Sequence, residues 1–215
     1  MINKHPLQSM VYVVDDDSSI RNSLTSLFRS LDFQVESFSS PGEFLKHDIA
    51  DVPRCMILDV RMPGSNGLDF QASLLEAGIE MQIVFLTGRG DIPMSVRAMK
   101  SGAIDFLTKP YREQDLLDSV RTAIERDRKQ REIRRLMSDI RTCFATLSRR
   151  EKEALSLLAS GLLNKQVAEK MGLAEITVKI HRGSIMRKMH AKSFADLVKM
   201  SEALGVSERI WVAQT

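Results

Sequence analysis

Five polar side chains that follow short apolar runs could together perform metal and phosphate chemistry. Asp15 and Asp16 come directly after one run, Asp59 after a second, Thr87 after a third, and Lys109 shortly after a fourth. These runs cover residues 11–14, 55–58, 83–86 and 104–107. Short apolar runs separated by helix-like stretches are typical of buried parallel strands, whose carboxyl ends gather ligand chemistry at one edge. Carboxylates, a hydroxyl and an ammonium at that edge suit a hard divalent cation and a phosphoryl group.

A simpler interpretation exists for the first acidic group. Residues 15–18 precede the helical spacing of Ile20, Leu24 and Leu27, so their carboxylates could serve only to complement a helix dipole. That interpretation accounts for any one of the positions alone. It does not account for an acidic pair, a strand-end Asp, a strand-end Thr and a Lys-Pro pair in this order, so we favour the shared cleft.

Residues 10–126 resemble the receiver domain of response regulators. The matching motifs are Val14-Asp15-Asp16, Leu58-Asp59-Val60-Arg61-Met62-Pro63, Thr87-Gly88-Arg89-Gly90-Asp91 and Asp105-Phe106-Leu107-Thr108-Lys109-Pro110. The resemblance implies a flavodoxin-like fold. This is a doubly wound α/β domain with a five-stranded parallel sheet in the strand order 2-1-3-4-5.

The resemblance also implies a metal and a phosphoryl donor. Asp59 is then the residue that a sensor histidine kinase phosphorylates. Asp16, Asp59 and the backbone carbonyl of Arg61 hold Mg²⁺, and Asp15 acts mostly through a metal-bound water. Mg²⁺ takes a few carboxylate oxygens and keeps several waters, which agrees with this set. The Lys109-Pro110 peptide resembles a cis bond of the family.

The remaining receiver residues are expected to read out the phosphoryl group. Thr87 and Lys109 grip its oxygens, and a movement of the Thr87 hydroxyl lets Phe106 turn inward. The alternative for Phe106 is an ordinary core aromatic. Arg61 and Arg89 lie two positions beyond Asp59 and Thr87, where they could shade the phosphoryl group from water during slow autodephosphorylation.

Charge separates the chain into two parts. Residues 1–125 carry 12 Lys and Arg against 18 Asp and Glu, a net charge of −6, whereas residues 126–215 carry 19 against 10, a net charge of +9. An acidic first part and a basic second part indicate that the second part meets a polyanion.

Cysteine content and hydropathy bound the cellular setting. Two cysteines, Cys55 and Cys143, form no disulfide framework, so a reducing, cytoplasmic location is expected. The first ten residues lack the apolar core of a signal peptide, and no run approaches the ~18 apolar residues of a membrane span. No membrane partner is therefore expected.

One long helix is predicted over residues 112–144. Its first apolar face should pack on the receiver sheet, and the wholly polar turn at residues 125–132 should stand in solvent. Ile133, Leu136 and Ile140 then resume a spacing of three to four. This second stripe could pack on the following domain or on a second protomer. Residues 127–144 are therefore predicted as a helical linker.

Residues 145–215 are predicted to form an all-helical domain. Helical patterns cover residues 151–160, 164–171, 175–190 and 193–204, the first opened by a Ser148–Glu151 capping box. A tight turn at Gly172 joins the second and third as a helix-turn-helix. The stretch resembles the LuxR-type DNA-binding domain through Leu147-Ser148-Arg149-Arg150-Glu151, Asn164-Lys165-Gln166-Val167-Ala168 and Thr177-Val178-Lys179-Ile180-His181. The pair of domains resembles the NarL/FixJ family of transcriptional regulators.

Spacing divides the third helix into a core face and a groove-reading face. The predicted core residues are Val178, His181, Ile185 and Met189. On the other face, Lys179 can reach guanine acceptors and Ile180 a thymine methyl. The predicted phosphate contacts are Lys165, Thr177, Arg182, Arg187 and Lys188. Gly183 permits close approach to DNA or leaves the helix pliable, and Ala174 replaces the capping serine usual in the family. The alternative is a solvated basic face.

These features predict a phosphorylation-switched regulator of transcription, an activator rather than a turnover enzyme. Double-stranded promoter DNA, a homodimer formed on phosphorylation and RNA polymerase are the expected partners. The dimer surface lies at residues 91–100 or near residues 196–200. Two alternatives stay open: a phosphatase with Asp59 as nucleophile, disfavoured because Arg61 stands where a general acid would, and a receiver switched by protein contacts alone.

Overall fold

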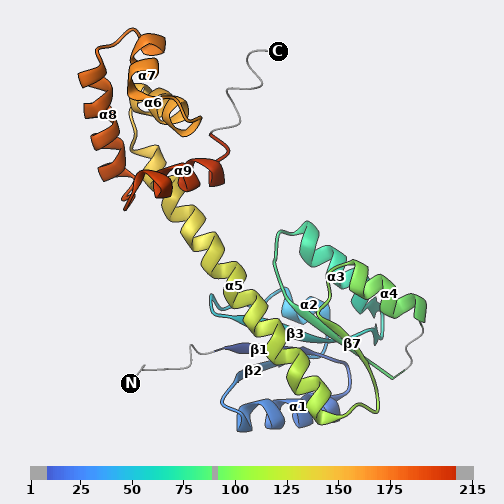
Figure 1. Ribbon diagram of the computed structural model, residues 1–215. Helices are drawn as coiled ribbons and strands as arrows, with labels where there is room; N and C mark the ends of the chain where they lie inside the picture. Colours follow the sequence, from blue (N-terminus) through green and yellow to red (C-terminus); the bar gives the residue numbers. More distant parts are fainter. Residues whose placement is uncertain (1–8, 89–91, 207–215) are drawn as a thin grey trace. The chain divides into compact units, whose positions relative to one another are not determined.

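The computed structural model describes residues 9–88 and 92–206 and divides the chain into two compact units, Met1–Arg131 and Glu132–Thr215 (Figure 1). Among the described residues, no helix combines the length and the apolar character needed to cross a membrane. Each unit has its own hydrophobic core.

The first unit is built on a five-stranded sheet in which all neighbouring strands are parallel. Its strands are β1 (Met10–Val14), β2 (Gln34–Phe38), β3 (Arg54–Asp59), β6 (Ile83–Thr87) and β7 (Asp105–Thr108). The order is β2-β1-β3-β6-β7, and a separate two-stranded hairpin is formed by β4 (Arg61–Met62) and β5 (Ser65–Asn66). The predicted 2-1-3-4-5 order is therefore confirmed, with β6 and β7 as the fourth and fifth strands.

Helices cover both faces of this sheet because successive strand residues point to opposite sides. Tyr12 lies in the core with the helices α2 (Pro41–Phe44), α3 (Gly67–Glu76) and α4 (Ile92–Lys100). Its neighbours Val11 and Val13 lie in the opposite core, with α1 (Ser18–Ser30) and the first half of α5 (Glu113–Ala145). A strand buried on both faces needs an unbroken apolar run, as the sequence has.

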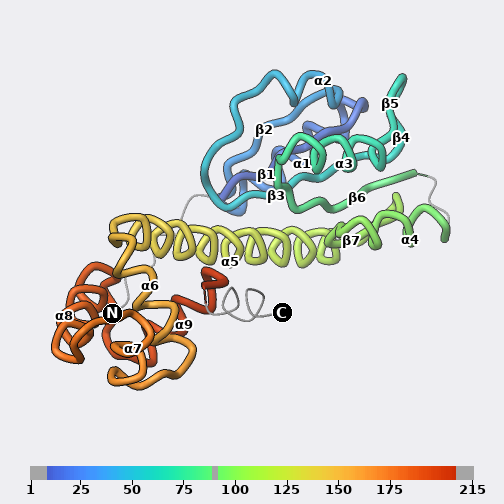
Figure 2. The backbone as a smooth tube through the Cα atoms, turned by 90° about the horizontal axis from the view of Figure 1, so that it is seen from above, coloured from blue at the N-terminus to red at the C-terminus, as the bar shows by residue number. Residues whose placement is uncertain are grey.

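The helix α5 is 33 residues long and uninterrupted (Figure 2). The prediction that its polar turn stands in solvent is wrong at Asp127, which is fully buried. The Asp127 carboxylate accepts hydrogen bonds from the backbone N–H of Arg54 at 3.0 Å and from Arg131 Nε at 2.5 Å. Arg131 also pairs with Asp51. Because of these contacts, residues up to Arg131 pack with the first unit. The first unit therefore ends five residues past the predicted boundary at 126.

The second unit is all-helical, as predicted. It contains α6 (Arg149–Ala159), α7 (Asn164–Met171), α8 (Glu175–Lys188) and α9 (Phe194–Ala203). The predicted capping box is present, with Ser148 and Glu151 bonding each other's backbone N–H at 3.2 and 2.7 Å. Gly172 has a φ of 64°, which lets the chain leave α7 in the left-handed region. Ala174 gives α8 no side-chain cap, in agreement with the sequence.

The second apolar stripe of α5 packs against the core of the second unit. Ile140, Cys143 and Phe144 pack against its core, whereas Ile133 and Leu136 are 60% and 56% exposed. The stripe therefore packs on the unit that follows it, and its first turn stays uncovered.

Candidate functional site

Three carboxylates meet at the carboxyl edge of the sheet. Asp15 directly follows β1, Asp16 is the next residue, and Asp59 ends the adjacent strand β3. One oxygen from each lies within 4.8 Å of the others, which is close enough for one cation to contact all three. Asp15 and Asp59 are buried and Asp16 is exposed. The donor set is all oxygen and open on one side, which fits Mg²⁺.

Lys109 is the cation of this cluster. Its Nζ lies 2.7 Å from Asp15 Oδ2 and 3.0 Å from Asp59 Oδ2. Its backbone N–H donates to the carbonyl of Thr87 at 2.7 Å, which ties the segment after β7 to the end of β6. The Lys109–Pro110 peptide bond is cis, as the resemblance implied. The Lys109 ammonium thus lies between two carboxylates, and its backbone is hydrogen-bonded to the neighbouring strand.

Burial shapes the electrostatics of the cluster. It raises the pKa of Asp15 above its usual value, although the hydrogen bond from Lys109 acts in the opposite direction. Burial alone would lower the pKa of Lys109, but its hydrogen bonds with Asp15 and Asp59 outweigh this and raise it. Lys109 therefore keeps its positive charge at neutral pH, which attracts an arriving phosphoryl group and opposes a divalent cation.

Of the other predicted receiver residues, Arg61 contacts Asp59 and Thr87 lies on the neighbouring strand β6. Thr87 ends β6 and is fully buried. Arg61 is exposed, and its backbone N–H donates to Asp59 Oδ1 at 3.1 Å. Phe106 is half-buried and packs beside Phe85, with ring centroids 6.2 Å apart. Arg89, predicted to shade the phosphoryl group, lies outside the described residues.

Gly67 is a residue of this site that the sequence reasoning missed. A Cβ atom at Gly67 would lie 2.4 Å from the backbone oxygen of Asp59, and its N–H donates to the carbonyl of Val60 at 2.9 Å. Only glycine lets the start of α3 approach the Asp59 backbone this closely. A glycine only eight residues after Asp59 was the available signal.

The predicted DNA-binding residues fall into two groups. Those exposed to solvent are Lys165, Lys179, Ile180, Gly183 and Arg187, while Thr177 is half-buried. Arg182 and Lys188 are half-buried and make contacts within the unit, and the exposed Lys179 pairs with Glu175 at the surface. The Arg182 guanidinium lies 4.2 Å from the centroid of the Phe194 ring. Lys188 Nζ lies 2.7 Å from Glu151 Oε2, a structural contact that the sequence did not indicate. Of the predicted core residues of α8, His181 is only half-buried.

Glu151 is a buried carboxylate that holds α6 to α8. It accepts hydrogen bonds from Lys188 and from Ser184, the latter at 2.7 Å, in addition to its capping contact. Burial alone would raise the pKa of Glu151, but the hydrogen bonds from Lys188, Ser148 and Ser184 lower it to about 2. The ion pair therefore braces the helix-turn-helix from inside.

Comparison with known proteins agrees with this architecture. The response regulator receiver domain matches residues 11–121, and the luxR family of bacterial regulatory proteins matches residues 145–201. The chain belongs to the NarL/FixJ family of two-component response regulators, in which a receiver domain is joined to a LuxR-type DNA-binding domain. Members of this family control transcription in response to phosphorylation and are not turnover enzymes.

Individual relatives cover almost the whole chain. Nodulation protein W of Bradyrhizobium diazoefficiens is 55% identical over 93% of this chain and 88% of its own length. The response regulator TmoT of Ectopseudomonas mendocina is 46% identical over 92% and 90%. The solved structure of the response regulator StyR matches with a TM-score of 0.82 at 44% identity, covering 91% of this chain and 98% of that one. Both domains and their order are thus shared with these proteins.

Proposed function

We propose that Asp59 is the phosphoryl acceptor and that a sensor histidine kinase is the donor. An oxygen of the Asp59 carboxylate attacks the phosphorus of a phosphohistidine, the P–N bond breaks, and the imidazole nitrogen leaves with its electron pair. A carboxylate is a weak nucleophile, so the reaction depends on in-line positioning and charge neutralisation. The observation that carries this proposal is the end-of-strand position of Asp59, 3.0 Å from Lys109 Nζ and beside two further carboxylates.

Asp15, Asp16, Asp59 and the backbone carbonyl of Arg61 are the proposed ligands of Mg²⁺ and its waters. When bound, Mg²⁺ neutralises the charge that gathers on the transferred phosphoryl oxygens. The chain's own part is to hold the carboxylates in place. The N–H of Asp17 donates to Asp15 Oδ1 at 2.9 Å, and that of Arg61 donates to Asp59 Oδ1. Both hydrogen bonds orient the carboxylates before the cation arrives.

Lys109, Thr87 and Phe106 form the proposed switch. At Asp59 the phosphoryl group carries about −1.5 to −2 charges in place of the single charge of the carboxylate, which draws the Lys109 ammonium from Asp15 onto the phosphoryl oxygens. The Thr87 hydroxyl then turns to donate to the same group. Phe106 packs at the edge of the core, where it can follow this change. The switch requires two packings of similar energy, biased by the phosphoryl group.

Dimerisation through α4 is the proposed output of the receiver. Ile92, Val96 and Met99 on this helix are 79%, 45% and 47% exposed, which is a large apolar surface to leave in water. The last helix, near Asp196, is the alternative surface. A dimer reads two half-sites at once, so its DNA affinity gains from effective concentration. Activation through RNA polymerase and action in the cytoplasm complete this proposal.

The DNA-reading surface is proposed at the exposed face of α8. Lys179 and Ile180 are placed for base edges, and Gly183 for close approach. Lys165, Thr177, Arg182 and Arg187 are proposed to contact phosphates. Lys188 can reach DNA only by leaving Glu151, so we give it a bracing role first. Arg61 and Arg89 are proposed to slow the loss of the phosphoryl group by shielding it from water.

The deciding experiment compares the wild type with Asp59→Asn in phosphodonor labelling and in DNA binding over random sites. Labelling by acetyl phosphate or a kinase should be lost in the variant, and the donor should tighten DNA binding only in the wild type. Equal labelling of both proteins would refute Asp59 as the acceptor. Tight DNA binding without any labelling would instead favour a receiver switched by protein contacts.

A further inference from the structure

Two large apolar side chains are exposed on α8, the second helix of the helix-turn-helix. Ile176 and Ile180 are 64% and 65% exposed, and they lie about one helical turn apart on the same side of the helix. Ile185 follows Ile176 by two and a half turns, so it lies on the opposite side, and it is fully buried in the core of the second unit. Ile176 and Ile180 therefore face away from that core.

The two isoleucines begin a continuous exposed stripe along α8. Gly183 and Arg187 are also exposed, and they follow Ile180 at the three- and four-residue spacing that keeps side chains on one side of a helix. In helix-turn-helix proteins, the amino-terminal residues of the second helix contact base edges in the major groove. Ile176 lies in the first turn of α8, which is the end that contacts bases in this class of protein.

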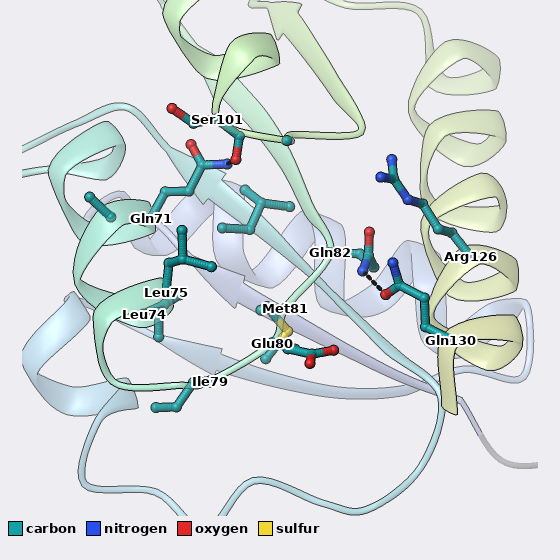
Figure 3. A pocket seen from close by; sticks show the side chains of 13 residues that line it. Gln71, Leu74, Leu75, Ile79, Glu80, Met81, Gln82, Ser101, Arg126 and Gln130 are labelled. Carbon is teal, nitrogen blue, oxygen red and sulfur yellow. Dashed lines mark hydrogen bonds between the residues drawn. The ribbon is translucent and has the colours of Figure 1, made fainter. Parts of the chain in front are cut away.

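Local structure gives no reason for an isoleucine at position 176. A β-branched residue is a poorer helix former than alanine, and an exposed one gains little from packing. The exposed Leu75 of the receiver unit is different, because Leu74 and Ile79 line the same hollow of about 330 Å³ and share its apolar surroundings (Figure 3). The packing of the second unit thus does not account for Ile176, whereas a contact with DNA does.

The surroundings of the stripe indicate that duplex DNA covers it. Residues 126–215 carry a net charge of +9, which attracts a polyanion. Lys179 lies beside the stripe, and its ion pair with Glu175 spans 3.1 Å at the surface, where a phosphate or a base can replace the carboxylate. Phosphates have no attraction for an isoleucine side chain. The base edges of the major groove present one apolar group, the C5 methyl of thymine.

We propose that Ile176 contacts a thymine methyl group in the major groove, beside the thymine contacted by Ile180. Ile176 then joins Lys179 and Ile180 on the DNA-reading surface of α8 proposed above, on which this contact depends. Four positions correspond to about 6 Å along a helix axis, and successive base pairs are about 3.4 Å apart. The half-site should therefore contain two thymines no more than about two base pairs apart, on either strand, each contacted by one isoleucine.

The first experiment removes single methyl groups from the DNA. Binding-site selection with the full-length protein and acetyl phosphate defines the half-site, and each thymine of one half-site is then replaced singly by deoxyuridine. Deoxyuridine lacks only the C5 methyl and keeps the hydrogen-bonding groups of thymine. At two positions the replacement should weaken binding by the wild type about fourfold, which corresponds to about 0.8 kcal/mol for a buried group of this size. Equilibrium binding at one fixed salt concentration measures these losses.

The second experiment assigns each methyl group to a side chain. Ile176→Ala should abolish the loss at one of the two positions and leave it at the other, and Ile180→Ala should do the converse. Both variants should fold, because the two side chains are exposed and alanine favours a helix, and thermal unfolding checks this. Leu75→Ala, at an exposed leucine of the receiver unit, is the matched control and should keep both losses.

The contact of Ile176 is refuted if wild type and Ile176→Ala respond alike to every deoxyuridine replacement, or if the selected half-site contains no thymine. Lys179→Ala separates this result from a failure of the DNA-reading surface. A relaxed base preference in Lys179→Ala would leave the surface in place while the contact of Ile176 fails. Failure of the wild type to select any sequence would refute the surface and the contact together.

Discussion

The Lys109 ammonium lies 3.0 Å from one oxygen of Asp59, while the Arg61 N–H donates to the other oxygen. The phosphoryl acceptor proposed here is thus contacted by a charged side chain at one oxygen and by a backbone N–H at the other. Lys109 also lies 2.7 Å from Asp15, so its charge opposes any cation that enters the cluster. Lys109 therefore has two effects that can be measured separately: it opposes Mg²⁺ binding, and it stabilises the phosphoryl group.

Lys109→Met should tighten Mg²⁺ binding about tenfold, because it removes a positive charge within a few ångströms of the cation. The same substitution should weaken the donor-dependent gain in DNA affinity, since the phosphoryl group loses its partner. Calorimetric titration and DNA binding with and without acetyl phosphate measure the two effects. Lys46→Met, which changes an exposed lysine, is the control. Unchanged or weaker Mg²⁺ binding by Lys109→Met would contradict the charge argument.

Gly67→Ala should destabilise the receiver unit by about 1–3 kcal/mol, because the new Cβ would lie 2.4 Å from the Asp59 carbonyl oxygen. The backbone must shift at the acceptor, so labelling by acetyl phosphate should slow as well. Gly42→Ala is the matched control, since a Cβ there meets nothing within 4 Å. Denaturant unfolding and initial labelling rates provide the two readouts. Equal behaviour of the two alanine variants would count against a tight approach at Gly67.

Asp127→Ala should lower the free energy of unfolding of the receiver unit by about 3–5 kcal/mol, the usual cost of breaking a buried ion pair. It leaves Arg131 without its buried partner and the Arg54 N–H without an acceptor. Glu132→Gln, an exposed acidic residue of the same helix, should change stability by less than about 0.5 kcal/mol. Urea titrations compare the two variants. A loss below about 1 kcal/mol for Asp127→Ala would refute the bracing role.

Acid should weaken the DNA-binding unit through Glu151. Its pKa is about 2 in the folded protein, below its ordinary value of 4.5. A lowered folded pKa contributes stability that is full above pH 4.5 and is lost as the pH falls toward 2. Denaturation of wild type and Glu151→Gln at pH 7, 4 and 3 should show a difference that shrinks on acidification, while the exposed Glu153→Gln follows the wild type. A constant difference would contradict this prediction.

Substitution of Lys179 should change DNA specificity, whereas substitution of Lys188 should change stability. Lys179 is exposed and its pairing with Glu175 spans 3.1 Å at the surface, so DNA can replace that partner. Lys179→Ala should cost about 1–3 kcal/mol of specific binding and relax the base preference. Lys188→Ala should chiefly lower stability, because it leaves the Glu151 carboxylate buried and unpaired. Binding-site selection and thermal unfolding separate the two, and a large specificity change in Lys188→Ala would reverse the assignment.

Local pattern was sufficient to predict the sheet and its acidic edge. Buried parallel strands need continuous apolar runs, so Asp15 and Asp59 were visible as the residues that end them. The glycine at 172 and the Ser148 capping box likewise marked helix ends from neighbouring residues alone. In each of these cases the physical cause lies within a few positions of the residue itself.

The features that were missed depend on partners far away in the chain. Asp127 sits in a run of charged residues that has the pattern of a solvated turn, yet its acceptor role depends on Arg54, 73 positions earlier. The contact between Lys188 and Glu151 spans 37 positions. The distance between Gly67 and the Asp59 carbonyl depends on how α3 packs against β3, which residue type alone does not predict.

The buried carboxylate at the end of the receiver has a practical consequence for dissecting the protein. A fragment cut after residue 126 would lack Asp127, which accepts the Arg54 N–H, and Arg131, whose guanidinium neutralises the Asp127 carboxylate. Such a piece would begin the strand that carries Asp59 with an unmet hydrogen-bond donor. Isolated receivers intended for kinase assays should therefore end beyond Arg131, where the first compact unit closes.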